Sequence, residues 1–253
     1  MDVMQAVKAH HEFIKARGHE VVMTVLIGSQ NYLLDNANSD IDTFTFILPS
    51  ERDLYLGREP LSGEIEVEDG KCMYKDIRLA LNLLKKTSPN SVECFTGQYR
   101  YYESKYTSIL EKYLDNEYTI NKMIHCNYEH MLYAMAGMAH QLTKRNMPAG
   151  KRYSHALRLD SMKDNFLNFA SAFQLLKLLP RDYEEALHAK RDILESHEAY
   201  YNDGCTSIAN ILDECCDKFK KTPIQHAIEV EGLKLIEEMQ QELMHYYMKE
   251  VIT

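Results

Sequence analysis

Strand-like apolar runs occur only in the first 103 residues of this 253-residue chain, and this division restricts its fold more than any other feature. A continuous run of apolar and β-branched residues at 21–28 has the length of a buried strand, and a second such run spans 41–49. Residues 64–77 have the strand-like character and the central glycine of a hairpin. These segments predict a mixed sheet flanked by helices.

Helical periodicity precedes and follows the strand runs. A first helix is predicted at residues 2–17, and the two adjacent histidines within it are expected at the surface. Four to six further helices are expected after residue 103, and the last is a long amphipathic segment that begins at Pro223. We therefore expect an α+β domain over residues 1–103 and an all-α domain over residues 104–253.

The composition is typical of a soluble globular protein, with 45% apolar and 26% charged residues. The formal charge of -9 argues against general binding of nucleic acid, since phosphate binding rests mainly on Lys and Arg. The six cysteines form no C-x-x-C pair, so neither a redox motif nor a zinc site is indicated. The sequence contains no apolar run long enough for a bilayer and no signal-peptide pattern, so we expect a cytoplasmic protein without a membrane partner.

Two carboxylates, Asp40 and Asp42, stand at the beginning of the second strand run. Side chains two residues apart on a strand point the same way, with Cα atoms roughly 6.5–7 Å apart, so these carboxylates would project together. Their mutual repulsion would be offset best by a divalent cation. Mg²⁺ prefers carboxylate oxygens together with substrate phosphates. The alternative is an exposed turn in which the D-x-D sequence occurs by chance.

Gly28 and Ser29 precede this pair, at the end of the first strand run. Glycine permits close approach of the backbone, and serine offers both a hydroxyl and a backbone N–H to an anion. An anion-binding bend about a dozen residues before a carboxylate pair is suited to a metal-chelated phosphate. A nucleoside triphosphate (NTP) is the commonest ligand of that kind.

The stretch GSQNYLLDNANSDID resembles the signature of the DNA polymerase β nucleotidyltransferase superfamily, in which Gly-Ser is followed by Tyr and then by Ser-Asp-x-Asp. More narrowly, the chain resembles predicted nucleotidyltransferases of bacteria and phages, some of them associated with RNA repair. YKDIRLALNLLKKTSPNSVECF is similar to that group's Asp-initiated helix, Asn-Pro-like turn and Glu, although here the turn reads SPN. GKRYSHALRL is similar to its Lys-x-x-x-His-Ala-x-Arg block. The resemblance covers roughly residues 25–160, and Leu33 departs from it because the group often has Gly after the Tyr.

The resemblance implies a polymerase β-like α+β fold and a site with two Mg²⁺ or Mn²⁺ ions. Asp40 and Asp42 would be ligands of these ions, and a third carboxylate would join them. Asp76 matches the helix-opening Asp of the group and is the first candidate for that ligand, while Glu66 and Glu68 are the others. An ordinary helix cap is the alternative role of Asp76.

The other residues that the resemblance implies would contact the nucleotide. Ser29 and the Gly28 backbone would hold the β- and γ-phosphates. Lys151, His155 and Arg158 would either cover the triphosphate from the helical half or receive the anionic surface of an RNA or protein acceptor. The alternative for the basic residues is a solvated helix face, and for His155 it is a packed position in the core.

The resulting prediction is nucleotidyl transfer from Mg²⁺-NTP to an acceptor, with release of pyrophosphate. The acceptor could be an RNA 3′ end, a protein hydroxyl or a small molecule. A nucleotide-sensing or partner-binding module without transfer is the second hypothesis. Metal-dependent hydrolysis by the same carboxylates is the third, and it lacks the histidine clusters usual in such sites.

Overall fold

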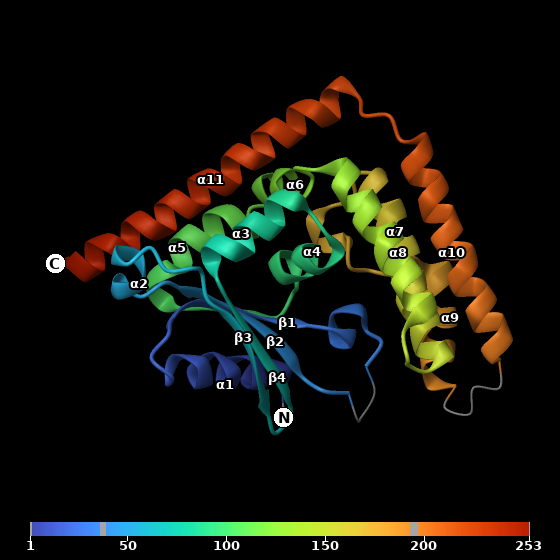
Figure 1. Ribbon diagram of the computed structural model, residues 1–253, viewed down its shortest axis with the longest axis horizontal. Helices are drawn as coiled ribbons and strands as arrows, with labels where there is room; N and C mark the ends of the chain where they lie inside the picture. Colours follow the sequence, from blue (N-terminus) through green and yellow to red (C-terminus); the bar gives the residue numbers. More distant parts are fainter. Residues whose placement is uncertain (1, 36–38, 193–196, 253) are drawn as a thin grey trace.

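The computed structural model describes residues 2–35, 39–192 and 197–252, and its centre is a five-stranded mixed sheet with helices on both faces (Figure 1). β2 and β4 are parallel, and the other neighbouring strands are antiparallel. The predicted α+β fold, with a mixed sheet and an all-helical C-terminal region, is confirmed. The strand order is β3-β4-β2-β1-β5, formed by β1 (Glu20–Ile27), β2 (Asp42–Leu48), β3 (Ser62–Val67), β4 (Gly70–Asp76) and β5 (Arg100–Tyr102).

The two faces of the sheet pack against different helices. On one face, Ile14 of α1 forms a buried cluster with Val21, Ile47 and Cys72 of the strands. The other face is covered by α3 and α4, and the ring of Phe95 on α4 lies 4.9 Å from that of Phe46 on β2. The helices of this half are α1 (Val3–Lys15), α2 (Glu51–Tyr55), α3 (Ile77–Lys86) and α4 (Pro89–Thr96).

Seven α-helices follow within the described residues, where four to six were expected. The difference arises because α5 makes only about one turn, which is too short to leave a periodic pattern. None of the described helices has both the length and the apolar character needed to cross a membrane. The helices are α5 (Thr107–Leu110), α6 (Glu117–Ile124), α7 (Tyr128–Lys144), α8 (Ala149–Leu167), α9 (Pro180–Arg191), α10 (Glu198–Lys218) and α11 (Pro223–Ile252).

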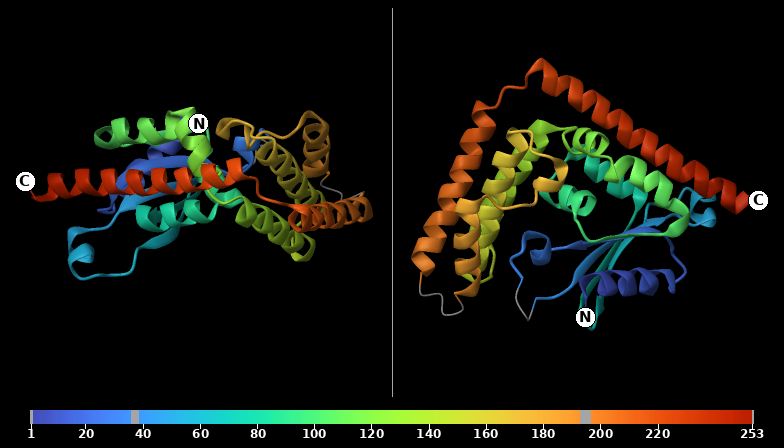
Figure 2. Two further views of the ribbon diagram at one scale, coloured as in Figure 1. Left: turned by 90° about the horizontal axis from the view of Figure 1, so that it is seen from above. Right: turned by 180° about the vertical axis from the view of Figure 1, so that it is seen from behind.

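These helices form two groups around the sheet. The long α11 runs along α3, α5 and α6, whereas α7, α8, α9 and α10 form a block that stands beside the connection between β1 and β2 (Figures 1 and 2). The apolar core is continuous from the central strands to α10 and α11. The division at residue 103 stays a prediction, because the two halves share this core.

Three local predictions were wrong. Neither the edge strand β5 nor helix α2 was among the predicted elements, and Ser50 caps α2 by accepting the N–H of Asp53 at 3.1 Å. The adjacent histidines of α1, His10 and His11, are not at the surface but buried, with 3% and 0% of their surface exposed. Threonine hydroxyls of the sheet provide hydrogen-bonding partners for both imidazoles.

Candidate active site

A cleft of about 450 Å³ opens between the β1–β2 connection and the helices α8 and α9. All of the residues predicted for the site line this cleft, except Asp76. The residues that share it are Gly28, Ser29, Asp40, Asp42, Lys151, His155 and Arg158. The cleft is also lined by residues that sequence reasoning missed, among them Lys190 and Asp192 of the α9 region. The role of Lys190 is taken up below, while Asp192 places a carboxylate on the α9 side of the cleft.

The carboxylates of Asp40 and Asp42 both face the cleft. Asp42 is half-buried at the first position of β2, and Asp40 is exposed. Burial raises the pKa of Asp42 and repulsion from Asp40 raises it further, although a hydrogen bond from the Lys71 backbone opposes this. Neither carboxylate forms an ion pair with any described residue, and the Lys71 ammonium pairs with Glu64 at 2.7 Å instead. The pair thus carries uncompensated negative charge that a divalent cation would neutralise.

The bend after β1 is built on Gly28. Its φ of 91° and ψ of -157° lie in a region that favours glycine, which has no Cβ to clash. Its N–H donates to the Oε1 atom of Glu93 at 2.6 Å, so this donor is already engaged within the protein. The expected contact of the Gly28 N–H with a phosphate is therefore replaced by a contact with Glu93. Ser29 follows in a short 3₁₀ turn and lines the cleft.

The loop that follows Ser29 is held by the helical block. Leu33 adopts a left-handed conformation, with φ of 56° and ψ of 29°, which is the conformation that glycine adopts without strain. Leu33 therefore occupies a position that suits glycine, and the loop keeps its turn although this residue has a Cβ. The Tyr183 hydroxyl donates to the Leu33 carbonyl at 3.2 Å, and the Lys190 ammonium donates to the Leu34 carbonyl.

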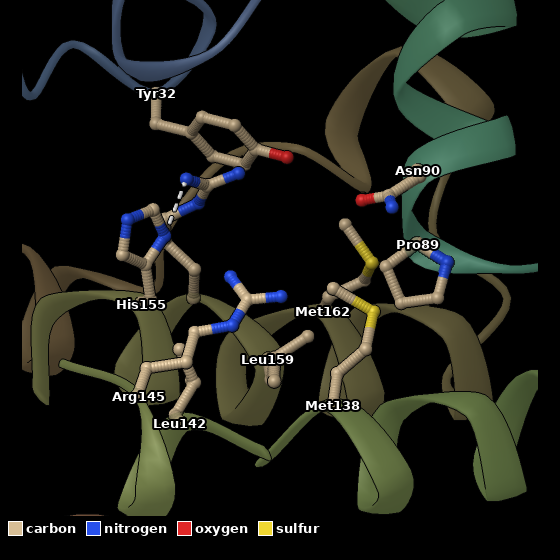
Figure 3. Close-up of a pocket in the computed structure, with 10 residues that line it drawn as sticks. Tyr32, Pro89, Asn90, Met138, Leu142, Arg145, His155, Leu159 and Met162 are labelled. Atoms are coloured by element: carbon tan, nitrogen blue, oxygen red, sulfur yellow. Dashed lines mark hydrogen bonds between the residues drawn. The ribbon is translucent and has the colours of Figure 1, made fainter. Parts of the chain in front are cut away.

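Basic side chains form the opposite wall of the cleft. The Arg158 guanidinium lies 3.2 Å from the centre of the Tyr32 ring and donates to Nδ1 of His155 at 3.0 Å (Figure 3). Burial lowers the pKa of His155 to about 3, with further lowering by Arg158 and Lys151, so the imidazole is neutral. It acts as an acceptor that orients Arg158. His155 is thus largely buried, yet it belongs to the cleft wall.

Lys190 adds a cation to this wall from α9. Its pKa is lowered, chiefly by burial and then by the neighbouring charges of Lys151 and Arg158. Cations that lower one another's pKa in a half-buried site are stabilised by an anion, in the same way that the carboxylate pair would be stabilised by a cation. The cleft therefore presents acids on one side and bases on the other, an arrangement suited to a phosphate chain chelated to a metal ion.

A smaller pocket continues from the cleft, since both are lined by His155 and Arg158. Figure 3 shows the Tyr32 hydroxyl, the Asn90 amide and the Arg145 guanidinium pointing into it from three sides. The remaining lining is apolar and comes from Pro89, Met138, Leu142, Leu159 and Met162. Small-molecule sites share this mixture of apolar walls and a few convergent polar groups, but the volume of this pocket, about 60 Å³, is well below theirs.

Asp76 does not lie with the other predicted residues. In the parallel pairing of β2 and β4 it is opposite Ile47, which is about 16 Å along β2 from Asp42 at about 3.3 Å per residue. Its buried carboxylate accepts the N–H of Arg78 at 2.9 Å and forms an ion pair with the Arg78 guanidinium at 2.7 Å. Asp76 is the N-cap of α3, so its placement as third metal ligand was wrong.

The other candidates for the third carboxylate lie on the far side of β4 or in a turn. Glu66 is on β3, opposite Lys71, so β4 separates it from Asp42, and Glu68 belongs to the β3–β4 turn. Within the described parts of the chain, no group of three or more His, Cys, Asp or Glu side chains is arranged to hold a metal ion. The pair at Asp40 and Asp42 fits one Mg²⁺ that also binds substrate phosphates, and the predicted second ion stays a prediction.

Comparison with known proteins adds one finding. The sequence model of the RNA repair pathway DNA polymerase beta family matches residues 3–163. This span contains the whole sheet, the carboxylate pair and the basic residues of α8. The comparison with curated proteins gives no match.

Proposed function

Because this chain belongs to the RNA repair pathway DNA polymerase beta family, we propose that it is a metal-dependent nucleotidyltransferase that uses an NTP. The observation that carries the proposal is the placement of the acidic pair and the basic wall on opposite sides of one cleft. The triphosphate lies between them, where Lys151, Arg158 and Lys190 neutralise its charge. Ser29 contacts the same phosphates from the bend after β1.

The residues present fit a single bound Mg²⁺ or Mn²⁺ ion. Asp40 and Asp42 hold it together with phosphate oxygens, and it supplies charge neutralisation for the departing pyrophosphate. The chain's own contribution is to orient the triphosphate against these carboxylates. Positioning of this kind provides much of the rate enhancement in phosphoryl and nucleotidyl transfer.

We place the nucleobase at the mouth of the smaller pocket of Figure 3, which continues from the triphosphate wall through His155 and Arg158. The pocket's own volume of about 60 Å³ is too small to enclose a whole base. The flat base packs between apolar side chains there, and Asn90 and Arg145 provide hydrogen-bonding groups for its edge. The acceptor is an RNA 3′ end, in keeping with the family's description, while a protein hydroxyl and a small molecule are the other candidates.

The proposal is tested by measuring Mg²⁺-dependent pyrophosphate release with each NTP and a single-stranded RNA. The double variant Asp40→Asn, Asp42→Asn should lose all metal-dependent release while it remains folded, because both proposed ion ligands become neutral amides. Asp217→Asn changes an exposed aspartate on α10 and is the matched control, with release at the wild-type rate. Full turnover in the double variant would refute the proposal.

A second candidate function is a nucleotide-binding module without transfer. It is favoured by the sheet face beside Asp42, where β4 provides Lys71 and then Met73 rather than a third carboxylate. Calorimetric binding of Mg²⁺-NTP without pyrophosphate release would support this candidate. Met73→Glu adds a carboxylate level with Phe44, on the same face of the sheet as Asp42, and should then create or raise nucleotidyl transfer. Leu83→Glu, at an exposed position of α3, is its control.

A further inference from the structure

His10 makes two hydrogen bonds from beneath the acidic end of the sheet. Its Nδ1 lies 2.9 Å from the Thr43 hydroxyl, and its Nε2 lies 2.9 Å from Oδ1 of Asp69. A carboxylate oxygen can only accept, so Nε2 of His10 carries a proton and donates it to Asp69. A helix-borne imidazole thus joins the strand that begins at Asp42 to the turn between β3 and β4.

That turn is in direct contact with the backbone between the two acids. The Asp69 carbonyl accepts the N–H of Ile41 at 2.7 Å, and Ile41 is the residue between Asp40 and Asp42. A Cβ added to Gly70 would lie 2.3 Å from the Ile41 carbonyl oxygen, so the two segments are packed as closely as a glycine allows. The position of the turn therefore sets the position of the acidic segment.

Asp69 depends on His10 for its own orientation. One of its carboxylate oxygens accepts from His10, and the other, Oδ2, is buried without a hydrogen-bond partner among the described residues. Loss of the imidazole would leave this carboxylate with no partner, and buried acceptors of that kind move or take up solvent. Thr43, the second partner of His10, directly follows Asp42.

We propose that His10 is a positioning residue that holds the Asp40–Asp42 segment in the conformation that binds a divalent cation, through Thr43 on one side and Asp69 on the other. The inference rests on the proposed function, and it names a determinant of metal affinity that contacts neither the ion nor the nucleotide. Loss of a group that orients a metal ligand without contacting the metal typically lowers metal affinity about 10–100-fold.

The neighbouring residue provides a matched control. His11 is equally buried and makes the same kind of bridge, from the Thr24 hydroxyl at 3.1 Å to the Glu103 carboxylate at 3.2 Å. This bridge lies toward β5, and the hydrogen bonds of His11 to described residues go to Thr24 and Glu103 rather than to residues 40–42. A general stabilising role would make the two histidines equivalent, whereas a positioning role distinguishes them.

The experiment compares His10→Leu with His11→Leu by two measurements. The first is the Kd of Mn²⁺, followed by electron paramagnetic resonance in the presence of a non-hydrolysable NTP. The second is the exchange rate of the Ile41 amide hydrogen. His10→Leu should raise the Kd at least about tenfold and accelerate exchange at Ile41, and His11→Leu should leave both unchanged. Equal effects of the two substitutions would overturn the inference.

Two further variants keep the test decisive if His10→Leu fails to fold. Asp69→Ala, in the solvent-facing turn, should raise the Mn²⁺ Kd in the same way, because the link from His10 to the turn is broken. His10→Gln places an amide donor near the position of Nε2 and should restore most of the affinity. Wild-type affinity in Asp69→Ala, or no rescue by Gln, would count against the positioning role.

The outcomes separate this inference from the proposed function. A wild-type protein that binds Mn²⁺ but transfers no nucleotide would refute the transferase, while the affinity of the His10 variants would still decide the inference. A wild-type protein that binds no Mn²⁺ would refute both. Wild-type transfer together with unchanged Mn²⁺ affinity in the His10 variants would refute the inference alone.

Discussion

The Glu93 carboxylate accepts the backbone N–H of Gly28 at 2.6 Å, and this bond fixes the bend that precedes the acidic pair. The same Oε1 atom accepts from the Asn31 amide at 3.3 Å, and Oε2 lies 3.8 Å from the Arg158 guanidinium. Glu93 therefore connects the end of β1 with the basic wall on α8. It thereby adds to the contacts that Tyr183, Lys190 and Arg158 make between the two sides of the cleft.

Glu93→Ala should lower the free energy of unfolding by about 2 kcal/mol, because it leaves the half-buried Gly28 N–H without its acceptor. Glu93→Gln keeps an acceptor oxygen and should cost less, although it removes the charge beside Arg158. Urea unfolding with an unchanged m-value would measure both effects. Equal stability of the Ala variant and the wild type would contradict the assigned role.

Asp42→Asn should stabilise the protein near neutral pH. A carboxyl whose pKa is higher in the folded than in the unfolded chain binds its proton more tightly when folded, so stability falls as pH rises through that folded pKa. Asn removes this titration, and its advantage should vanish below about pH 4, the unfolded value. Urea unfolding across this range, with Asp217→Asn as control, checks the prediction. A less stable Asn variant at neutral pH would contradict it.

The sequence was informative wherever the signal is local. The strand runs around Gly28 and Asp42 have period and length typical of buried strands, and the structure places strands there. The loop between them is the most specific motif, and both its Gly-Ser bend and its acidic end line the cleft. The departure at Leu33 could be noticed in the sequence, but its left-handed backbone could not.

Contacts between distant segments could not be predicted. The hairpin pattern indicated β4 but gave no information on its pairing with β2. In the structure the two strands are parallel, so the start of β4 lies beside Asp42, and Asp76, at the end of β4, lies away from the site. Lys190 reaches the cleft only through the packing of α9. The buried histidine His10 was expected at the surface because its partners, Thr43 and Asp69, are distant in sequence.

Asp76→Asn tests the reassignment of that residue from ion ligand to helix cap. Asn retains a cap acceptor but loses the buried ion pair with Arg78, so the free energy of unfolding should fall by about 2 kcal/mol. The Kd of Mn²⁺ should remain at the wild-type value, because the residue lies at the opposite end of β2 from Asp42. A large loss of Mn²⁺ affinity without loss of stability would restore Asp76 as a ligand.

Leu33→Gly should raise the free energy of unfolding, because Leu33 holds a left-handed conformation that costs roughly 1–2 kcal/mol for a residue with a Cβ. The greater freedom of glycine in the unfolded chain offsets about 0.5–1 kcal/mol of this, so a net gain of up to about 1 kcal/mol is expected. Leu33→Ala keeps the Cβ and serves as the control, with no gain. The midpoints of urea unfolding of the two variants test this prediction. A Gly variant that is less stable than the wild type would show that the backbone at Leu33 is not strained.

Lys190 should make nucleotide affinity fall at a lower pH than an ordinary lysine would. Its lowered pKa means that the ammonium loses its proton at a lower pH than an ordinary lysine, so the affinity for Mg²⁺-NTP should fall as pH rises through that value. Lys190→Arg keeps the charge at every accessible pH and should flatten the profile, whereas Lys190→Ala should weaken binding about tenfold at neutral pH. Calorimetric titration at several pH values measures both, with the exposed Lys220→Ala as control. A profile in Lys190→Arg that is as steep as in the wild type would assign the titration to another group.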